Sequence, residues 1–429
     1  MDFQAALAYL DEHMSYQKTG RIDSPSVEPI TAICDALGQP HRSCPVIHVT
    51  GTNGKGSTVQ MISRLLAAQG LSVGTYTSPH LEHVTERIRR NGEPISEEEL
   101  GEAIGAVAEV APLVGQSPGY FEILTAAAFR WFADVAVDVM VIEVGLLGRW
   151  DATNIVDSQV AVITNIGLDH QEFAGPTLFD IAREKAGIVK PGSAVIIGET
   201  DPELITIFQD AGGAASLVVG DDFATTSNAL AVNGRLLDIR TPTTIYTDVF
   251  LPLNGAHQGD NAAVALAAVE TFFAAPLAEE VVLEGFAEVT MPGRFEILGR
   301  QPLTIIDGAH NPAGADVCAD VFFGDFHPEG RRILVVGTLR DPVAMLSALR
   351  ADDFDIVFVC NAPTPRTIPV AELQRAARSI GCEHVVAFDS VEAACRRAMD
   401  YADGDDAVLV TGSLYTAGAA RPVLNRLTN

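Results

Sequence analysis

The segment Gly51-Thr52-Asn53-Gly54-Lys55-Gly56-Ser57 combines two features that phosphate chemistry needs, glycines in a tight turn and a lysine. It follows an apolar run, Pro45–Thr50, and leads into a segment of helical periodicity, Ser57–Gln69, which ends before Gly70. In such a strand–loop–helix unit the backbone N–H groups face one concavity, the helix N-terminus adds partial positive charge, and the lysine reaches the outer phosphates. We therefore expect a nucleotide to be bound by Thr52, Asn53, Gly54, Lys55, Gly56 and Ser57.

The loop departs from the pattern G-x-x-x-x-G-K-[ST]. Its first glycine would fall at Val49, and Gly56 stands where Ser or Thr is expected. The alternative interpretation is a glycine-rich turn between a strand and a helix that binds no ligand. The strand, the helix and the lysine occur together, which favours nucleotide binding.

Two further side chains stand at the ends of predicted strands. Glu143 closes the very apolar run Asp138–Val144, and His170 follows the run Val160–Ile166. Ligands bind at the carboxyl ends of strands in open α/β sheets, and Mg²⁺ prefers oxygen ligands. A histidine after a strand is by itself more often structural. Together with Glu143 and the loop, however, His170 is better explained as a metal ligand.

Lysine is rare in this chain. Only four of the 28 basic residues are lysines, namely Lys18, Lys55, Lys185 and Lys190. Arginine serves wherever a positive charge suffices, but it cannot act as a compact or titratable amine. The retained lysines therefore indicate sites that need lysine chemistry, although a codon bias is the simpler alternative.

The overall composition excludes several classes of protein. The net charge of −28 disfavours a nucleic acid or an anionic membrane as partner, because the long-range field repels phosphate. The six cysteines form no C-x-x-C pair, and no run reaches about 18 apolar residues. We expect a cytoplasmic monomer of 429 residues in two or three domains.

Apolar runs alternate with amphipathic stretches, which predicts an α/β fold with a mostly parallel sheet. The segment Ser96–Val110 opens with a capping box that places Glu99 at N3. Residues 215–252 instead show β-branched alternation around Asn233-Gly234, which predicts an antiparallel excursion. Further predicted strands of this part are Ser72–Thr77 and Ser193–Gly198. Further predicted helices are Phe121–Phe132, Thr177–Ile188, His257–Phe273 and Ala278–Val289.

A second α/β block follows the turn at Met291-Pro292-Gly293. We predict a P-loop-type, mostly parallel sheet domain over residues 1–292 and a smaller Rossmann-like domain over residues 296–429. The predicted strands of the second domain are Leu303–Asp307, Arg332–Gly337, Asp355–Cys360, His384–Phe388 and Ala407–Thr411.

The loop and the motifs that follow it resemble the Mur ligase superfamily and, within it, the folylpolyglutamate synthase and dihydrofolate synthase family. The resemblance covers almost the whole chain, and the motifs occur in the family's order. They are GTNGKGS, TSPHL (77–81), FEILTAAAF (121–129), EVGLLGRWDATN (143–154), ITNIGLDH (163–170), EKAGIVK (184–190), NAA (261–263), GRFE (293–296), DGAHNP (307–312) and GSLYTAG (412–418).

The resemblance implies an ATP-binding central domain over 1–292 and a glutamate-ligase domain over 296–429. It assigns two Mg²⁺ ions to Ser78, Glu143, His170 and Lys185, with Lys185 carboxylated by CO₂. It assigns contacts with ATP to Asn261, Arg294 and Asp307, and it gives catalytic roles to Lys55, Lys185, Asp307 and His310. An arginine at the junction of two domains can also clamp a phosphate bidentately. Asp307-Gly308 alone would equally suit an ordinary strand-ending turn.

The implied substrates are ATP, L-glutamate and dihydropteroate or a reduced folate. Phe121 and the segment Thr85–Arg90 would contact the pterin, with Arg87, Arg89 and Arg90 holding folate carboxylates. Residues 21–27 would form a loop that covers dihydropteroate, and Ser413 would contact glutamate. Phe121 is equally well explained as a core residue, and Arg87 as part of a solvated basic patch. The implied reaction forms an acyl phosphate with release of ADP, after which the amine of glutamate displaces phosphate.

Two positions depart from the family pattern. Leu147 replaces a glycine in E-V-G-x-G-G-R, and Arg340 replaces the lysine of a D-K-D-type sequence. A muramyl-peptide ligase that uses a UDP-sugar is the nearest alternative, although the loop at Gly51 leaves little room for its N-terminal domain. A P-loop ATPase would leave the DGAHNP segment unexplained, and a dinucleotide-dependent dehydrogenase would need a G-x-G-x-x-G loop.

Overall fold

The computed structural model describes residues 1–14 and 25–428, so Lys18 and residues 21–24 of the expected substrate loop lie outside the described residues. The described chain forms two units. The first contains residues 1–229, 236–252 and 258–289, and the second contains residues 230–235, 253–257 and 290–429. Two short segments on the N-terminal side of residue 292 therefore group with the C-terminal unit.

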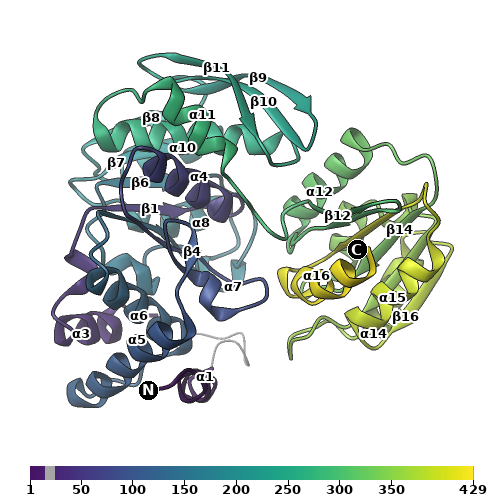
Figure 1. The fold of residues 1–429 in the computed structure, drawn as a ribbon, viewed down its shortest axis with the longest axis horizontal. Coiled ribbons are helices and arrows are strands. Elements are labelled where there is room, and N and C mark those ends of the chain that lie inside the picture. Colours follow the sequence, from purple (N-terminus) through teal and green to yellow (C-terminus); the bar gives the residue numbers. More distant parts are fainter. Residues whose placement is uncertain (15–24, 429) are drawn as a thin grey trace. The chain divides into compact units, whose positions relative to one another are not determined.

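The first unit is built on an eight-stranded sheet with the order β4-β3-β2-β5-β1-β6-β7-β8. Figure 1 labels β1, β4, β6, β7 and β8 of this sheet. Neighbouring strands from β2 to β8 are parallel, while β3 and β4 form an antiparallel edge. β1, β5 and β6 are buried along their whole length, as expected for central strands that are covered on both faces. The strands are β1 (Val46–Thr50), β2 (Val73–Tyr76), β3 (Ile88–Arg90), β4 (Glu93–Pro94), β5 (Val139–Glu143), β6 (Val160–Ile163), β7 (Ala194–Ile197) and β8 (Ala215–Val218).

Helices cover both faces of this sheet. One face packs against α1, α3, α5 and α6, and its part over β6 and β7 packs against α8 and α9. The helix α4 packs on β1, β2 and β5, and α11 packs against α4. Ser96 and Glu99 form the predicted capping box of α5. The helices are α1 (Phe3–Glu12), α3 (Glu28–Ala36), α4 (Lys55–Ala68), α5 (Glu97–Val110), α6 (Tyr120–Asp134), α7 (Gln171–Ala174), α8 (Leu178–Lys185), α9 (Pro202–Gln209), α10 (His257–Phe273) and α11 (Glu279–Ala287).

The antiparallel excursion is smaller than predicted. β9 (Ala224–Ala231), β10 (Gly234–Arg240) and β11 (Ile245–Leu251) form a separate three-stranded sheet, with Asn233 at positive φ in the predicted turn. The start of the predicted segment, residues 215–218, is instead β8, which pairs in parallel with β7. This part of the prediction was wrong, because alternation of residue types does not reveal which edge a short strand joins.

The second unit contains a six-stranded sheet with the order β12-β13-β17-β14-β15-β16. Only β12 is antiparallel to its neighbour, so the predicted α/β class is confirmed for both units. Its elements are β12 (Glu296–Arg300), β13 (Leu303–Ile306), α12 (Pro312–Asp325), β14 (Arg332–Val336), α13 (Pro342–Ala348), β15 (Ile356–Cys360), α14 (Val370–Ser379), β16 (Val385–Phe388), α15 (Val391–Tyr401), β17 (Ala407–Thr411) and α16 (Leu414–Thr428).

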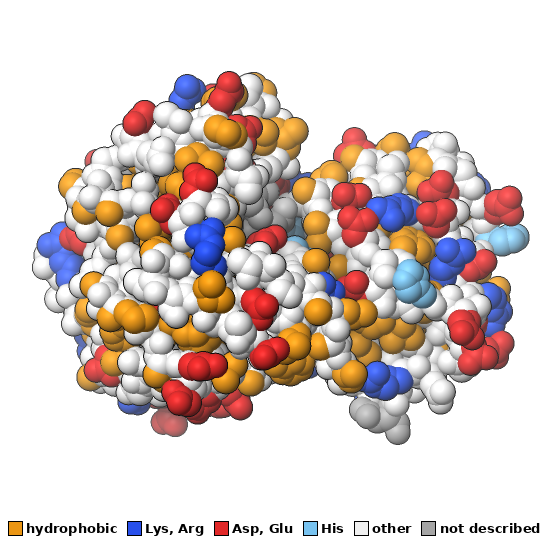
Figure 2. All heavy atoms as spheres, turned by 90° about the horizontal axis from the view of Figure 1, so that it is seen from above, with side chains coloured by type: hydrophobic (Ala, Val, Ile, Leu, Met, Phe, Trp, Pro, Cys, Tyr) orange, Lys and Arg blue, Asp and Glu red, His pale blue; other side chains and the backbone are white. Residues whose placement is uncertain are grey.

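The surface fits the composition. On the face drawn in Figure 2, Lys and Arg side chains are scattered among Asp, Glu and apolar ones rather than gathered in one basic area. None of the described helices combines the length and the apolar character that crossing a bilayer requires.

Candidate active site

The strand order gathers the predicted phosphate and metal residues at one edge of the large sheet. β2, β5, β1 and β6 are consecutive and parallel, so their carboxyl ends share this edge. Ser78 follows β2, Glu143 ends β5, the glycine-rich loop follows β1, and His170 follows β6. The register places Val49 of β1 beside Glu143.

The glycine-rich loop turns directly into α4. Gly54 has φ 80° and forms the N-cap, so the helix begins at Lys55, two residues earlier than predicted. The segment after β6 holds the loop, because the side-chain oxygen of Asn165 accepts from the N–H of Asn53 at 2.9 Å and Thr52 Oγ1 accepts from the N–H of Gly167 at 2.9 Å. A Cβ at Gly54 would lie 2.5 Å from Asn261 Oδ1, so Asn261 of α10 directly borders the loop.

Lys55 lies within its own loop. Its Nζ donates to the carbonyl oxygens of Gly51 and Thr52, both at 3.0 Å. These two carbonyl oxygens hold the ammonium group against the backbone of the loop, where it could offset the charge of a bound phosphate.

A second lysine reaches the same loop from α8. Lys185 Nζ donates to the carbonyl oxygen of Gly51 at 2.5 Å, and the Lys185 side chain is buried. Burial lowers its pKa well below the usual value, and the charge of Lys55 lowers it further, whereas Asp169 and Asp151 act in the opposite direction. This is the environment that favours a neutral, nucleophilic amine.

Glu143 and Ser78 are neighbours at the sheet edge. Glu143 is buried, and its Oε2 accepts a hydrogen bond from the backbone N–H of Ser78 at 3.0 Å. This bond orients the carboxylate at the end of β5 beside the residue that follows β2. Carboxylate and hydroxyl oxygens are ligands that Mg²⁺ accepts.

His170 occupies the N-cap of α7 with φ 51°. Its Nε2 lies 3.8 Å from Asp169 Oδ2, and its Nδ1 lies 3.9 Å from Glu172 Oε1. The sequence reasoning did not single out Asp169, although it directly precedes His170. Among the described residues, no group of three or more His, Cys, Asp and Glu side chains stands close enough together to hold a metal ion. A metal here would therefore need Ser78 or a modified Lys185 as well.

A buried network supports the loop that follows β5. Asp151 Oδ1 accepts from Thr153 Oγ1 at 2.5 Å, its Oδ2 accepts from the N–H of Leu146 at 2.7 Å, and His48 Nε2 lies 2.8 Å from Thr153 Oγ1. Burial raises the pKa of Asp151, and hydrogen bonds from Thr153 act in the opposite direction. Neither His48 nor Asp151 was predicted as a site residue; Asp151 and Thr153 lie in the quoted D-A-T-N segment, whereas His48 lies within β1.

Leu147 in this loop has φ 58°, the left-handed conformation that glycine adopts most easily. The carbonyl oxygen of Leu147 accepts from Thr50 Oγ1 at 2.5 Å, so the loop is anchored to the end of β1. The backbone thus keeps the conformation that suits the family's glycine although the residue is leucine.

Phe121 and Arg87 lie on the side of β2 and α6. Phe121 stands so close to Gly145 that a Cβ there would lie 2.3 Å from Phe121 Cζ, and its ring centroid is 5.9 Å from that of Tyr76. The Arg87 side chain is buried, and its Nε donates to His80 Nδ1 at 2.9 Å. Burial and the charge of Arg87 lower the pKa of His80 to about 4, so this histidine is neutral with its proton on Nε2.

The Arg87 guanidinium carbon lies 5.5 Å from the centre of the Tyr120 ring. Neither His80 nor Tyr120 was predicted as a site residue; His80 lies in the TSPHL segment, and Tyr120 directly precedes FEILTAAAF.

The second unit holds the remaining predicted residues at the carboxyl edge of its own sheet. Asp307 follows β13, and its Oδ2 and Oδ1 accept from the N–H groups of Phe295 and Ala309 at 2.9 and 2.8 Å. Arg294 directly precedes Phe295, and a Cβ at Gly308 would lie 3.5 Å from Arg294 Nη1. His310 Nδ1 lies 3.3 Å from the carbonyl oxygen of Gly308. Hydrogen bonds therefore join the turn that contains Arg294 to the turn that contains Asp307 and His310.

Ser413 is more deeply placed than a direct ligand of glutamate would need to be. Its side chain is buried, and its Oγ lies 2.8 Å from Thr416 Oγ1 and accepts from the N–H of Thr416 at 3.1 Å. It also donates to the carbonyl oxygen of Gly337 at 3.3 Å. These contacts tie β17 to β14.

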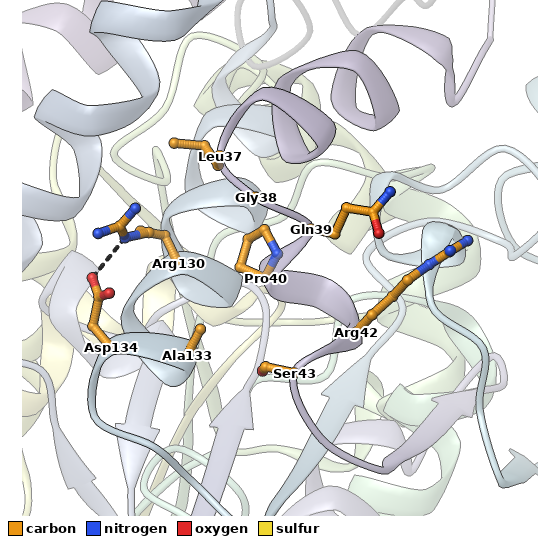
Figure 3. Close-up of a pocket in the computed structure, with 9 residues that line it drawn as sticks. All are labelled: Leu37, Gly38, Gln39, Pro40, Arg42, Ser43, Arg130, Ala133 and Asp134. Carbon is orange, nitrogen blue, oxygen red and sulfur yellow. Dashed lines mark hydrogen bonds and ion pairs between the residues drawn. The ribbon is translucent and has the colours of Figure 1, made fainter.

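A hollow of about 410 Å³ lies away from this edge (Figure 3). Ser43 and Asp134 line it, and they precede β1 and β5, which places the hollow near the amino ends of these strands. Arg130 pairs with Asp134 at 2.7 Å within it. None of the predicted phosphate or metal residues lines it, so it is not a candidate for the predicted chemistry.

Two protein families match the chain. The Mur ligase middle domain matches residues 49–269, and the Mur ligase glutamate ligase domain matches residues 293–414. The fold, the phosphate loop and these matches together define a Mur-type ATP-dependent ligase.

The relatives narrow this class. The dihydrofolate synthase/folylpolyglutamate synthase of Mycobacterium tuberculosis is 38% identical, with 97% of this chain and 93% of the relative covered. The Escherichia coli protein of the same name is 34% identical, with 93% and 91% covered. The chain belongs to the dihydrofolate synthase/folylpolyglutamate synthase family of ATP-dependent glutamate ligases.

Solved structures agree with this assignment. The Mycobacterium tuberculosis folylpolyglutamate synthase complexed with ADP and AMPPCP has a TM-score of 0.91 and 36% identity, with 99% of both chains covered. The Escherichia coli enzyme in complex with DHPP and ADP has a TM-score of 0.87 and 31% identity, with 99% of this chain and 98% of that one covered. The bifunctional Yersinia pestis enzyme with Mn, AMPPNP and L-glutamate bound has a TM-score of 0.85 and 31% identity, with the same coverage.

Proposed function

We propose that the enzyme joins L-glutamate to dihydropteroate, to tetrahydrofolate or to both, with ATP cleaved to ADP and phosphate. The observation that carries the proposal is the convergence of Lys55 and Lys185 on the carbonyl of Gly51, at the same sheet edge as Glu143. Relatives of the same family have been crystallised with ADP and DHPP and with L-glutamate, which supports these substrate classes.

In the first proposed step a carboxylate oxygen of the pterin substrate attacks the γ-phosphorus of ATP. The bond between this phosphorus and the β–γ bridging oxygen breaks, and ADP leaves. Lys55 and Arg294 would offset the phosphate charge, while Thr52, Asn53, Gly54, Gly56 and Ser57 would hold the phosphates through the loop and Asn261 and Asp307 would contact the rest of the nucleotide.

In the second step the neutral amine of glutamate attacks the carbonyl carbon of the acyl phosphate. The bond from this carbon to the phosphoryl oxygen breaks, phosphate leaves, and the amide nitrogen loses a proton. Activation as an acyl phosphate is needed because a carboxylate is a poor electrophile without a good leaving group. We assign His310 and Asp307 to the side of the incoming glutamate, where correct placement supplies much of the rate enhancement.

Ser78, Glu143, His170 and a carboxylated Lys185 would hold two Mg²⁺ ions. Their oxygen and imidazole donors suit a divalent cation, and the bond from the Ser78 N–H already orients Glu143. Bound Mg²⁺ would neutralise charge on the transferring phosphoryl group.

Carboxylation of Lys185 is proposed from the setting of its amine. A neutral amine attacks the carbon of CO₂, the nitrogen loses a proton, and a carbamate anion results. Burial and the neighbouring Lys55 lower the pKa of Lys185, and both effects favour the neutral amine that the reaction needs.

For the pterin substrate we propose Phe121 as an apolar surface and Arg87 as a nearby positive charge. We propose that Ser413 contributes to the glutamate site by shaping the turn after β17, through its hydrogen bonds to Thr416 and Gly337. We assign ATP binding to residues 1–292 and glutamate ligation to residues 296–429. All six cysteines are free thiols, which supports a cytoplasmic protein, and we propose that it works as a monomer.

The test is an ADP-release assay with purified enzyme, MgATP and each substrate in turn. We expect ADP to form only when glutamate is present together with dihydropteroate or tetrahydrofolate. The rates of ADP release with the two pterins show which of them is the better substrate. Carboxylate oxygen labelled with ¹⁸O should appear in the released phosphate, because the acyl carbon–oxygen bond breaks. Steady ADP release without glutamate, or unlabelled phosphate, would contradict the proposal.

A further inference from the structure

Arg294 lies in a turn that is held on both flanks by carboxylates of the second unit. The N–H of Gly293 donates to Glu296 Oε2 at 2.8 Å, and the N–H of Phe295 donates to Asp307 Oδ2 at 2.9 Å. Phe295 has φ 43°, a conformation that a non-glycine residue keeps only when its surroundings enforce it. The orientation of Arg294 therefore depends on where these two carboxylates stand.

Glu296 is in turn held by a helix from the far end of the chain. Arg421 Nε lies 3.0 Å from both carboxylate oxygens of Glu296, and Arg421 Nη2 lies 2.8 Å from Oε1. Both side chains are partly shielded, with 28% and 19% of their surfaces exposed. Multidentate contacts of this kind fix the plane of a carboxylate, which a single-point lysine contact does not.

We propose that Arg421 is a positioning residue for ATP use: through Glu296 it sets the turn that presents Arg294. Arg421 itself touches no substrate in this proposal. The inference rests on the proposed role of Arg294 at the phosphates of ATP. The competing explanation is a purely structural one, in which the pair only fastens α16 to β12.

The first experiment compares Arg421→Met, Arg421→Lys and Glu296→Gln with the wild-type enzyme. Removal of the charge-assisted contact should raise the KM for MgATP about tenfold, the equivalent of one such hydrogen bond. Arg421→Lys should give an intermediate rise, and the KM for glutamate should change less than twofold. Arg331→Met is the matched control, because Arg331 makes a comparable contact with Asp406 in the same unit, at 2.7 Å, without reaching the turn. An unchanged KM for MgATP in all three variants would overturn the inference.

The exchanged variant Glu296→Arg/Arg421→Glu separates positioning from fastening. It restores an ion pair between α16 and β12, but Arg at position 296 cannot accept the N–H of Gly293. We expect its Tm to recover while the KM for MgATP stays high. Recovery of KM together with Tm would show that the pair is only structural.

Arg294→Ala completes the set. It should raise the KM for MgATP, and adding Arg421→Met to it should change that KM less than twofold, because both act on one contact. If Arg294→Ala leaves ATP kinetics unchanged, the proposed role of Arg294 fails and the inference fails with it. If Arg294→Ala has its effect and the Arg421 and Glu296 variants have none, the inference alone fails.

Discussion

Lys185 Nζ donates a hydrogen bond of 2.5 Å to the carbonyl oxygen of Gly51, although the two residues lie 134 positions apart in the chain. Lys55 donates to the same carbonyl oxygen, so two lysine amines share one acceptor. Two ammonium groups in such proximity repel each other, and the buried one loses its proton more easily. An arginine at position 185 could not lose its proton in this way.

Carboxylation of Lys185 predicts an activity that depends on CO₂. Enzyme held in CO₂-free buffer should lose most of its ligase rate and regain it after bicarbonate is added, and Lys185→Met should fall by at least about 100-fold in kcat without bicarbonate rescue. Lys190→Arg is the control, since Lys190 contacts the carbonyl of Asn154 and not the loop, and it should keep the bicarbonate response. A wild-type rate that is indifferent to CO₂ would contradict the assignment.

Replacement of Lys55 should strongly weaken nucleotide binding, and arginine at this position should not restore it. The ammonium group fits between the carbonyls of Gly51 and Thr52, and a planar guanidinium cannot occupy that position. We expect Lys55→Arg and Lys55→Met each to weaken the binding of AMPPNP by about 100-fold or more in titration calorimetry. Near-normal affinity of Lys55→Arg would mean that the loop needs only a positive charge.

At position 147 the glycine variant should be more stable than the alanine variant, the reverse of the usual order in a helix. Leu147→Ala loses buried surface and keeps the left-handed backbone, whereas Leu147→Gly also relieves the backbone, which is worth about 1 kcal/mol. We expect both variants to be less stable than the wild type, because burying leucine contributes about 2 kcal/mol. The glycine variant should be the more stable of the two in urea unfolding.

The control is Leu124, which is fully buried within α6. There alanine should be more stable than glycine by about 1 kcal/mol, the ordinary order in a helix. The same order at both positions would refute the left-handed conformation of Leu147.

His48 should make folding stability depend on pH. Burial, with a smaller effect of Lys190, lowers the pKa of His48 to about 3, below its usual value of about 6.5. Between these values the unfolded chain binds a proton that the folded chain does not. Its contribution to stability is therefore complete above pH 6.5 and is lost as the pH falls toward 3.

His48→Gln should flatten this dependence, measured as the free energy of unfolding from pH 4 to pH 7. It should also cost roughly 1–3 kcal/mol at pH 7, because the bond to Thr153 is disturbed in a buried place. His384→Gln, at a position that is largely exposed, should leave the slope unchanged. Parallel curves for the wild type and His48→Gln would exclude this role of His48.

Local patterns in the sequence were sufficient for much of the fold. The apolar runs became β1, β5 and β6, Ser96 and Glu99 formed their capping box, and Asn233-Gly234 formed its turn. Each of these depends on residues a few positions apart, whose spacing is visible in one dimension. The edge strand β8 was misassigned because its pairing with β7 involves no local signal.

For the site, the residue types at the ends of strands already pointed to phosphate and metal chemistry around Lys55, Glu143 and His170, and their order along the chain pointed to the family. What only the tertiary structure decided is which of these groups meet. The strand order sets Ser78 against Glu143, burial lowers the pKa of Lys185 beside Gly51, and α16 carries Arg421 to Glu296. Such contacts span tens to more than a hundred residues, and they arise from packing, which no local spacing of residues encodes.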